Sequence, residues 1–139
     1  MKNLLIFAGT LLLLSCRNES ETELFQAQNQ CPTAKVTDAV SDLKSDDGIF
    51  GIHSEKITET TLSAEVSFGG GCDPNHKFEL YLSPNRLIAG PLPYFDARIV
   101  FTTTDYCKRL DQRTLCFDLT AFRKQNPNAV IVLKKFQEK

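Results

Sequence analysis

The sequence predicts an all-β protein: a small antiparallel β-sandwich, immunoglobulin-like or similar, that follows a signal peptide and a tether. Three observations predict this fold class. Hydrophobic and polar residues alternate along several short segments, clusters of Gly, Pro, Asn and Asp separate these segments, and no long amphipathic helical pattern lies between them. The pattern yields five or six strands, and a chain of 139 residues suits one domain with a modest core.

The first element is a signal peptide over residues 1–15. A short basic start precedes the apolar run Leu4–Leu14, which is too short to span a bilayer because a spanning helix needs roughly 20 residues. The run ends in Leu13-Leu14-Ser15-Cys16, which resembles the lipobox of bacterial lipoproteins. The resemblance implies that Cys16 takes a diacylglycerol on its thiol, becomes the mature N-terminus and is often acylated on its amino group, for example with palmitate. The alternatives are an ordinary secretory signal and an uncleaved buried helix.

The predicted lipid on Cys16 indicates where the protein works. A single acyl chain binds a membrane marginally, whereas two or three chains make attachment stable. We therefore expect a protein anchored in the cell envelope, in the outer membrane of a Gram-negative bacterium, with the leaflet undecided. This lipid is the only cofactor-like group that we expect.

Residues 16–34, the lipidated cysteine and a polar segment, are predicted to be a tether. The segment is rich in Glu, Gln and Asn, and Leu24-Phe25 is its only adjacent apolar pair. A solvated linker is the simplest interpretation. Alternatively, Glu19, Glu21 and Glu23 resemble the acidic surface-export signal of some Gram-negative lipoproteins.

Residues 35–139 are predicted to be a single β domain. Residues 35–44 are compatible with an edge strand or a short helix. Alternation then begins, and Gly69-Gly70-Gly71 indicates a bulge or a close approach to neighbouring backbone. The side chains expected to face the core are Leu62, Ala64, Val66 and Phe68; Phe78, Leu80 and Leu82; Ile99 and Phe101; Leu115, Phe117 and Leu119; and the run Val130–Leu133.

Four cysteines remain once Cys16 is assigned to lipid, and an even number in an exported chain indicates disulfides. Four cysteines allow three complete pairings, and the sequence alone does not choose among them. We prefer Cys72 with Cys107, because both lie in predicted loops just outside strands. The second bridge would join Cys31 in the tether to Cys116, whose side chain should face away from Leu115 and Phe117.

A metal site is the competing interpretation of the same residues. Cys72 and His76, with Cys107 nearby, offer one imidazole and one or two thiolates to zinc or copper. An oxidising compartment argues against this site, and His76 is then a structural histidine that hydrogen-bonds the glycine-rich turn. We expect His53 to be a surface residue after a strand over Ile49–Ile52.

The composition excludes some functions. There are 16 basic and 17 acidic residues, so nothing attracts nucleic acid. The chain has two histidines and lacks the Gly-x-Ser-x-Gly and His-Glu-x-x-His motifs, and we expect a protein that is not an enzyme. A hydrolase using paired carboxylates stays an alternative, although Asp105 and Asp111 are interpreted as turn residues.

The order of motifs is similar to a group of uncharacterised exported bacterial lipoproteins. In that group a Gly-Gly-Cys-x-x-His-x-Phe strand is followed by a later cysteine and a Phe-Asp-Leu strand. Here Gly70-Gly71-Cys72, His76 and Phe78 precede Cys107 and Phe117-Asp118-Leu119, with three residues instead of two between Cys72 and His76. The resemblance implies a β domain and a Cys72–Cys107 pair, and it implies no reaction.

We therefore expect a membrane-tethered β domain that binds an envelope protein, a glycan or a small ligand. The alternative is a metal-binding or redox module that uses Cys72, His76 and Cys107.

Overall fold

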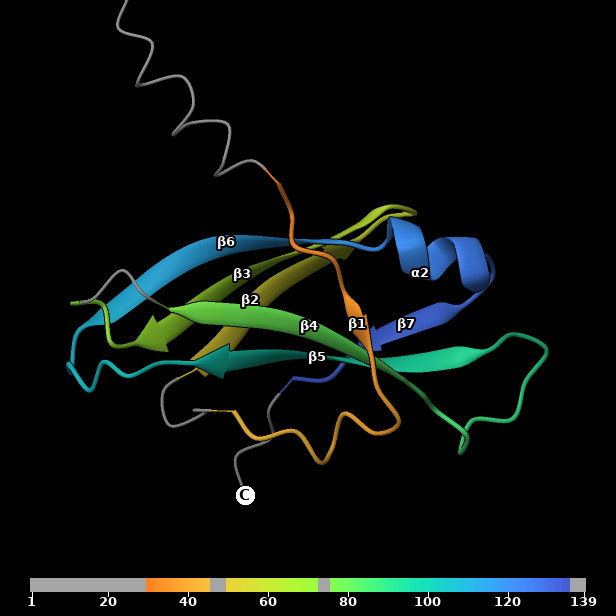
Figure 1. The fold of residues 1–139 in the computed structure, drawn as a ribbon, viewed down its shortest axis with the longest axis horizontal. Helices are drawn as coiled ribbons and strands as arrows, with labels where there is room; N and C mark the ends of the chain where they lie inside the picture. Colours follow the sequence, from red (N-terminus) through yellow and green to blue (C-terminus); the bar gives the residue numbers. More distant parts are fainter. Residues whose placement is uncertain (1–29, 46–49, 73–75, 136–139) are drawn as a thin grey trace, which may run out of the picture. The chain divides into compact units, whose positions relative to one another are not determined.

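Seven strands and one short helix make up the described part of the chain, which in this computed structural model covers residues 30–45, 50–72 and 76–135 (Figure 1). The predicted signal peptide, the predicted lipidation site Cys16 and most of the predicted tether lie outside the described residues. The three-stranded sheet has the order β2-β3-β6, and the four-stranded sheet has the order β1-β4-β5-β7. The elements are β1 (Lys35–Val36), β2 (Phe50–Ile57), β3 (Thr61–Gly69), β4 (Lys77–Pro84), β5 (Tyr94–Thr102), β6 (Leu110–Asp118), α2 (Thr120–Gln125) and β7 (Val130–Leu133).

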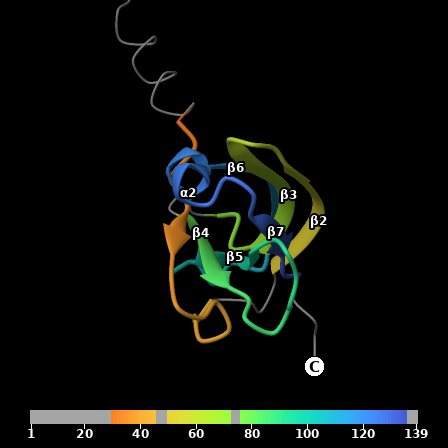
Figure 2. The same ribbon diagram turned by 90° about the vertical axis from the view of Figure 1, so that its right-hand side faces the viewer.

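The two sheets share one hydrophobic core. In Figure 2 the ribbon of β2 and β3 lies on one side of this core and that of β4 and β5 on the other. Along β3 the predicted inward side chains are at most 2% exposed, whereas the alternate residues are more exposed. The all-β prediction and the core face of β3 are therefore confirmed. Of the run Val130–Leu133, however, only Ile131 and Leu133 are buried, because side chains alternate between the two faces of a strand. The fully buried large side chains include Leu62 and Phe68 of β3, Leu80 and Leu82 of β4, Ile99 and Phe101 of β5, and Phe117 and Leu119 of β6 and its end.

The four-stranded sheet is mixed, because its two outer strands run parallel to their neighbours. β1 pairs in parallel with β4, and β7 pairs in parallel with β5. A parallel neighbour needs a crossover connection, and α2 lies in the connection that leads from β6 to β7. Its six residues are too few for a recognisable amphipathic period, which explains why the sequence did not indicate a helix.

The first residue of the compact domain lies four positions before the predicted boundary. Cys31–Lys139 form one compact unit, whereas the sequence placed the boundary at residue 35. Asp118 explains the difference, because its N–H donates to the carbonyl of Pro32 and its carbonyl accepts from the N–H of Ala34, each at 2.9 Å. The segment before β1 thus lies along the end of β6.

Residues 35–44 contain a two-residue strand followed by irregular backbone. Val40 is buried in this stretch, its N–H donates to the hydroxyl of Ser83 at 3.2 Å, and its carbonyl accepts from Arg98 at 3.1 Å. The edge-strand alternative therefore holds for Lys35 and Val36 only. Within the described residues no helix has the length and apolar character that spanning a membrane requires.

Candidate functional site

The glycine run after β3 makes a tight turn against the β5–β6 connection. Gly70 has a φ of +101°, which glycine adopts readily and other residues rarely do. Its N–H lies 3.1 Å from the carbonyl oxygens of both Cys107 and Arg109. A Cβ at this position would stand 2.8 Å from the carbonyl oxygen of Asp105. The predicted close approach to neighbouring backbone is confirmed.

The Cys72–Cys107 disulfide closes this turn. Asp105 supports both of its halves, because one carboxylate oxygen accepts from the N–H of Cys72 at 3.0 Å and the other from the N–H of Cys107 at 2.8 Å. Sequence reasoning interpreted Asp105 only as a turn residue. An Asp two residues before a cysteine is a signal for an Asx turn, but its second contact depends on a residue 33 positions away.

The second disulfide joins Cys31 to Cys116. The side chain of Cys116 lies on the outer face of β6, opposite Ser63 and away from the inward Leu115 and Phe117. The structure thus has the preferred Cys72–Cys107 bridge and also the second bridge that the sequence allowed, which ties the start of the domain to the end of β6.

His76 lies directly before β4 and packs against aromatic residues. Its ring centroid is 4.9 Å from that of Phe68 in an edge-on arrangement and 5.8 Å from that of Phe101. Its Nδ1 lies 3.0 Å from the hydroxyl of Thr103. The histidine is structural as expected, but its hydrogen-bond partner is Thr103 and not the glycine turn, because the turn points its N–H groups at the β5–β6 connection.

The proposed metal ligands are not available as a set. Cys72 and Cys107 bond to each other, so neither sulfur is a thiolate that could bind a metal, and His76 would be left alone. No cluster of three or more His, Cys, Asp or Glu side chains occurs within residues 30–45, 50–72 and 76–135. The turn thus brings Cys72 and Cys107 close enough to bond to each other, and in this structure they form no metal-ligand set with His76.

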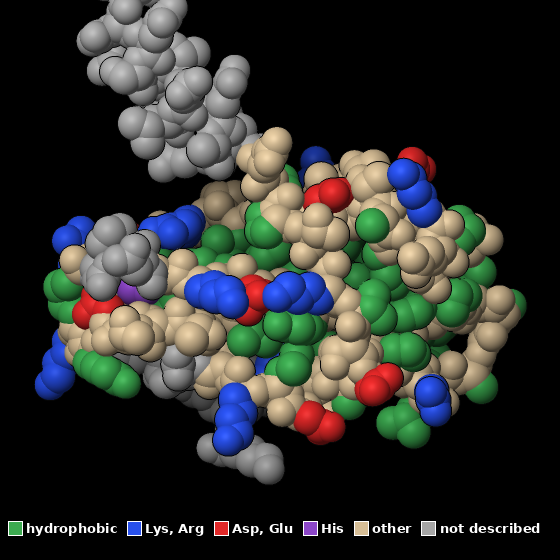
Figure 3. Space-filling view, in the orientation of Figure 1, with side chains coloured by type: hydrophobic (Ala, Val, Ile, Leu, Met, Phe, Trp, Pro, Cys, Tyr) green, Lys and Arg blue, Asp and Glu red, His purple; other side chains and the backbone are tan. Residues whose placement is uncertain are grey.

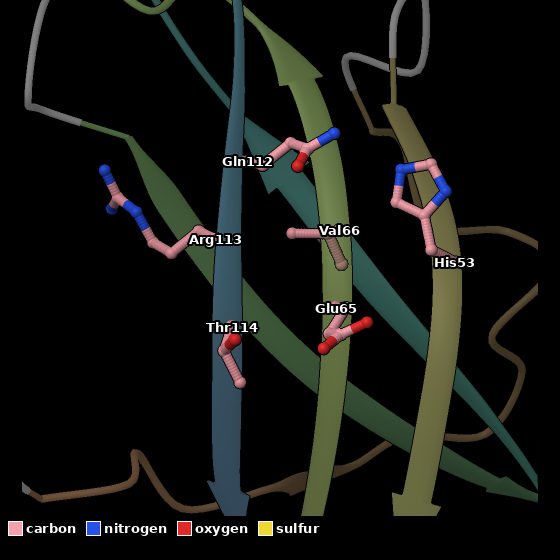
Figure 4. A pocket seen from close by; sticks show the side chains of 6 residues that line it. All are labelled: His53, Glu65, Val66, Gln112, Arg113 and Thr114. Carbon is pink, nitrogen blue, oxygen red and sulfur yellow. The ribbon is translucent and has the colours of Figure 1, made fainter.

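The outer face of the three-stranded sheet carries a shallow polar hollow of about 320 Å³. Figure 4 shows His53 on β2, Glu65 on β3 and Gln112 and Thr114 on β6, while Arg113 points away toward β4. The guanidinium of Arg113 lies 5.4 Å from the ring centroid of Phe68, where it covers the aromatic core.

His53 is exposed as predicted, although it lies inside β2 and not after it. The pairing of β2 with β3 shifts in register between Ile52 and Ser54, the two residues next to His53 in the chain. This irregularity lets the strand continue beyond Ile52, where the sequence placed its end. Beside it, the hydroxyl of Ser54 donates to Glu65 at 2.9 Å. The hollow offers hydrogen-bonding groups, and the imidazole of His53 is the one ring among the side chains that line it.

The most unusual surface is the loop between β4 and β5, residues 86–93, which we call the apolar loop. All eight of its residues are exposed, and every one from Leu87 to Pro93 is uncharged and apolar or glycine. Leu87 is 96% exposed, and Ile88 and Leu92 are each 43% exposed. Hydrophobic side chains gather at this right-hand end of the molecule in Figure 3.

Sequence reasoning used Gly90-Pro91 in this loop only as a turn signal. The run Leu87-Ile88-Ala89 and Leu92 were visible in the sequence, but a hydrophobic run is equally compatible with burial. Only the structure shows that these side chains face solvent.

The base of the apolar loop is held firmly. The N–H of Asn85 donates to the carbonyl of Tyr94 at 2.8 Å, and the side chain of Asn85 accepts from the N–H of Leu87 at 3.0 Å. The N–H of Val130 donates to the carbonyl of Pro93 at 2.9 Å, which ties the loop to β7. The apolar side chains are therefore presented on a fixed base.

Comparison with known proteins assigns no family. No family model and no curated protein match this chain. The fold is similar to the crystal structure of a protein of unknown function, DUF1344, from Bacteroides vulgatus, with a TM-score of 0.49 and 10% sequence identity. The match covers 78% of this chain and spans 58% of the length of that protein.

Proposed function

We propose that this chain is a lipid-anchored cell-envelope protein whose β domain acts by binding and not by catalysis. The observation that carries the binding part is the apolar loop, because exposed contiguous apolar surface is costly in water and marks contact sites.

The two disulfides support the envelope location. Structural disulfides persist in oxidising compartments and are rare in the cytosol. Cys31–Cys116 and Cys72–Cys107 use four of the five cysteines of the sequence, so Cys16 is the one that remains for lipid. This division agrees with the interpretation of Leu13-Leu14-Ser15-Cys16 as a lipobox.

The chemistry of the apolar loop favours an apolar partner over a glycan. Sugar hydroxyls need hydrogen-bonding side chains, and Leu87, Ile88 and Leu92 provide none. The polar hollow beside His53 and Glu65 has such groups, but it is open, and no Phe, Tyr or Trp ring lines it for a sugar to stack on.

Metabolic labelling with a palmitate analogue tests the anchor. The wild-type chain should be labelled and should fractionate with membranes, and Cys16→Ala should lose both properties. The matched control is the double variant Cys31→Ala with Cys116→Ala, which removes two other cysteines, those of one disulfide, and should keep the label. An unlabelled wild-type chain, or a label that survives Cys16→Ala, contradicts the anchor.

Thiol titration and metal analysis of the purified protein distinguish the proposed binding function from the alternative function as a metal-binding or redox module. We expect no titratable thiol from the four paired cysteines and no bound zinc or copper. Free thiols at Cys72 and Cys107 together with one equivalent of metal would contradict the proposed function.

A further inference from the structure

We propose that the partner of the apolar loop is a lipid bilayer, into whose surface Leu87, Ile88 and Leu92 insert. The inference rests on the proposed function, because the lipid on Cys16 would hold the domain beside that membrane. The loop is the connection at the tip of the β4–β5 hairpin, and its backbone projects beyond the paired strands (Figure 1). A bilayer accepts a projecting tip without a pocket of matching shape, whereas a protein partner must provide one.

The backbone of the apolar loop is suited to a medium that offers few hydrogen bonds. Pro91 and Pro93 have no N–H, and the N–H of Leu87 is already bonded to the side chain of Asn85. Each unsatisfied N–H is costly in lipid, so the lack of a free donor at three of the seven residues from Leu87 to Pro93 lowers the cost of entering the interface. A protein partner would impose no such requirement, because it can supply acceptors.

The residues at the foot of the loop are of types that are found at the level of the lipid head groups. Arg86 is exposed on one side of the loop, and Tyr94 is half-buried on the other. Arginine extends its charge toward head groups while its stem lies along apolar surface, and tyrosine is enriched at membrane interfaces. From Leu87 to Pro93 no charge opposes insertion.

The tether is bonded to the half of β6 that is farther from residues 103–109, the tip opposite the apolar loop. Cys31 is bound to Cys116 near the end of β6, and the next element, α2, packs Phe122 against Phe95 at the foot of the loop. The opposite tip, residues 103–109, precedes the start of β6, and six residue steps, about 20 Å along that strand, separate Leu110 from Cys116. Fifteen residue steps separate Cys16 from Cys31, which corresponds to about 50 Å when extended and to about 20 Å for a flexible coil.

The absence of tryptophan from the sequence allows a direct test. Leu87→Trp places a single fluorophore in the apolar loop, and Tyr106→Trp places one at the opposite tip, where Tyr106 is 92% exposed. Each full chain is isolated with its lipid and reconstituted into vesicles of phosphatidylethanolamine and phosphatidylglycerol, with or without brominated acyl chains. We expect the indole emission of the Leu87→Trp chain to shift to shorter wavelength on reconstitution and to lose intensity with brominated lipid. The emission of the Tyr106→Trp chain should change in neither way.

Flotation of the vesicles separates the two proposals. A Leu87→Trp chain that floats with the vesicles but is not quenched overturns the membrane contact and leaves the anchor intact; a protein with an apolar pocket would then be the occupant. Quenching of the Tyr106→Trp chain as strong as that of the Leu87→Trp chain overturns a contact specific to the apolar loop. A chain that does not float overturns both the anchor and the contact.

Discussion

The carboxylate of Asp105 accepts a hydrogen bond from the N–H of Cys72, 3.0 Å away and 33 residues earlier in the chain. The other oxygen of the same carboxylate accepts from Cys107, the disulfide partner of Cys72. The β3–β4 turn and the β5–β6 connection are thus joined by one covalent bond and by one side chain that binds both of its ends.

We expect Asp105→Ala to destabilise the domain by about 2 kcal/mol or more, because hydrogen bonds to a charged group contribute about 1.5–3 kcal/mol each. Equilibrium denaturation in urea measures the loss. Asp105→Asn keeps one acceptor oxygen and should lie between the wild type and Asp105→Ala. The matched control is Asp42→Ala in an exposed turn, which should change stability by less than about 0.5 kcal/mol. Equal effects of Asp105→Ala and Asp42→Ala would contradict the role of Asp105.

Gly70→Ala and Gly90→Ala should differ strongly. At Gly70 the added Cβ would meet the carbonyl of Asp105 at 2.8 Å in a backbone conformation with positive φ, and the conformational cost alone is about 1–2 kcal/mol. At Gly90 the nearest heavy atom, on the ring of Tyr94, is 3.5 Å away, which is an ordinary contact. We therefore expect a lower midpoint of thermal unfolding for Gly70→Ala only. A Gly70→Ala protein as stable as Gly90→Ala would show that this turn relaxes freely.

Phe122→Ala should destabilise the protein by about 3–5 kcal/mol, as buried Phe→Ala changes do. Phe122 is 4% exposed and packs edge-on against Phe95, with ring centroids 4.8 Å apart. Because α2 leads to β7, we also expect faster amide exchange in Val130–Leu133. The control is Val132→Ala on the exposed side of β7, where 37% of the residue is accessible and the loss should be below about 1 kcal/mol. A similar loss for both variants would contradict the role of Phe122 in holding α2.

Protonation of Glu79 should lower the free energy of unfolding in acid. The hydrogen bond from Lys35 and a second contact from Lys77, at 3.0 Å, hold the pKa of Glu79 below its ordinary value of 4.5, although partial burial opposes them. The folded state therefore binds this proton less readily than the unfolded state. The contribution is fully present above pH 4.5 and is lost as the pH falls through the lowered pKa of the folded state.

Glu79→Gln should remove this part of the acid-side loss, measured as the free energy of unfolding between pH 6 and pH 2, about the range over which carboxylates titrate. Lys35→Met keeps the carboxylate but removes its main donor, so it should reduce the same loss without abolishing it. If Glu79→Gln loses stability in acid as steeply as the wild type, the ion pairs of Glu79 do not contribute.

The sequence by itself determined the β class and the core face of most strands, because alternation of period two is local and records which side of a sheet is buried. It also predicted the division of five cysteines into one at the lipobox and four that can pair. What depends on contacts between distant segments was decided by the tertiary structure. The parallel outer strands, the double support of the disulfide by Asp105 and the contact of His76 with Thr103 all join residues that only the paired sheets bring together.

In the apolar loop, the sequence did not determine whether the hydrophobic side chains are buried or exposed. A run such as Leu87-Ile88-Ala89 has the same composition whether it fills a core or faces water, since hydrophobicity indicates what a side chain gains from burial and not whether burial occurs. Here the β4–β5 pairing projects the run beyond the sheet, and no other described segment covers Leu87. The sequence thus predicts, through Cys16, where the protein works, and the tertiary structure shows which apolar side chains of this loop face solvent.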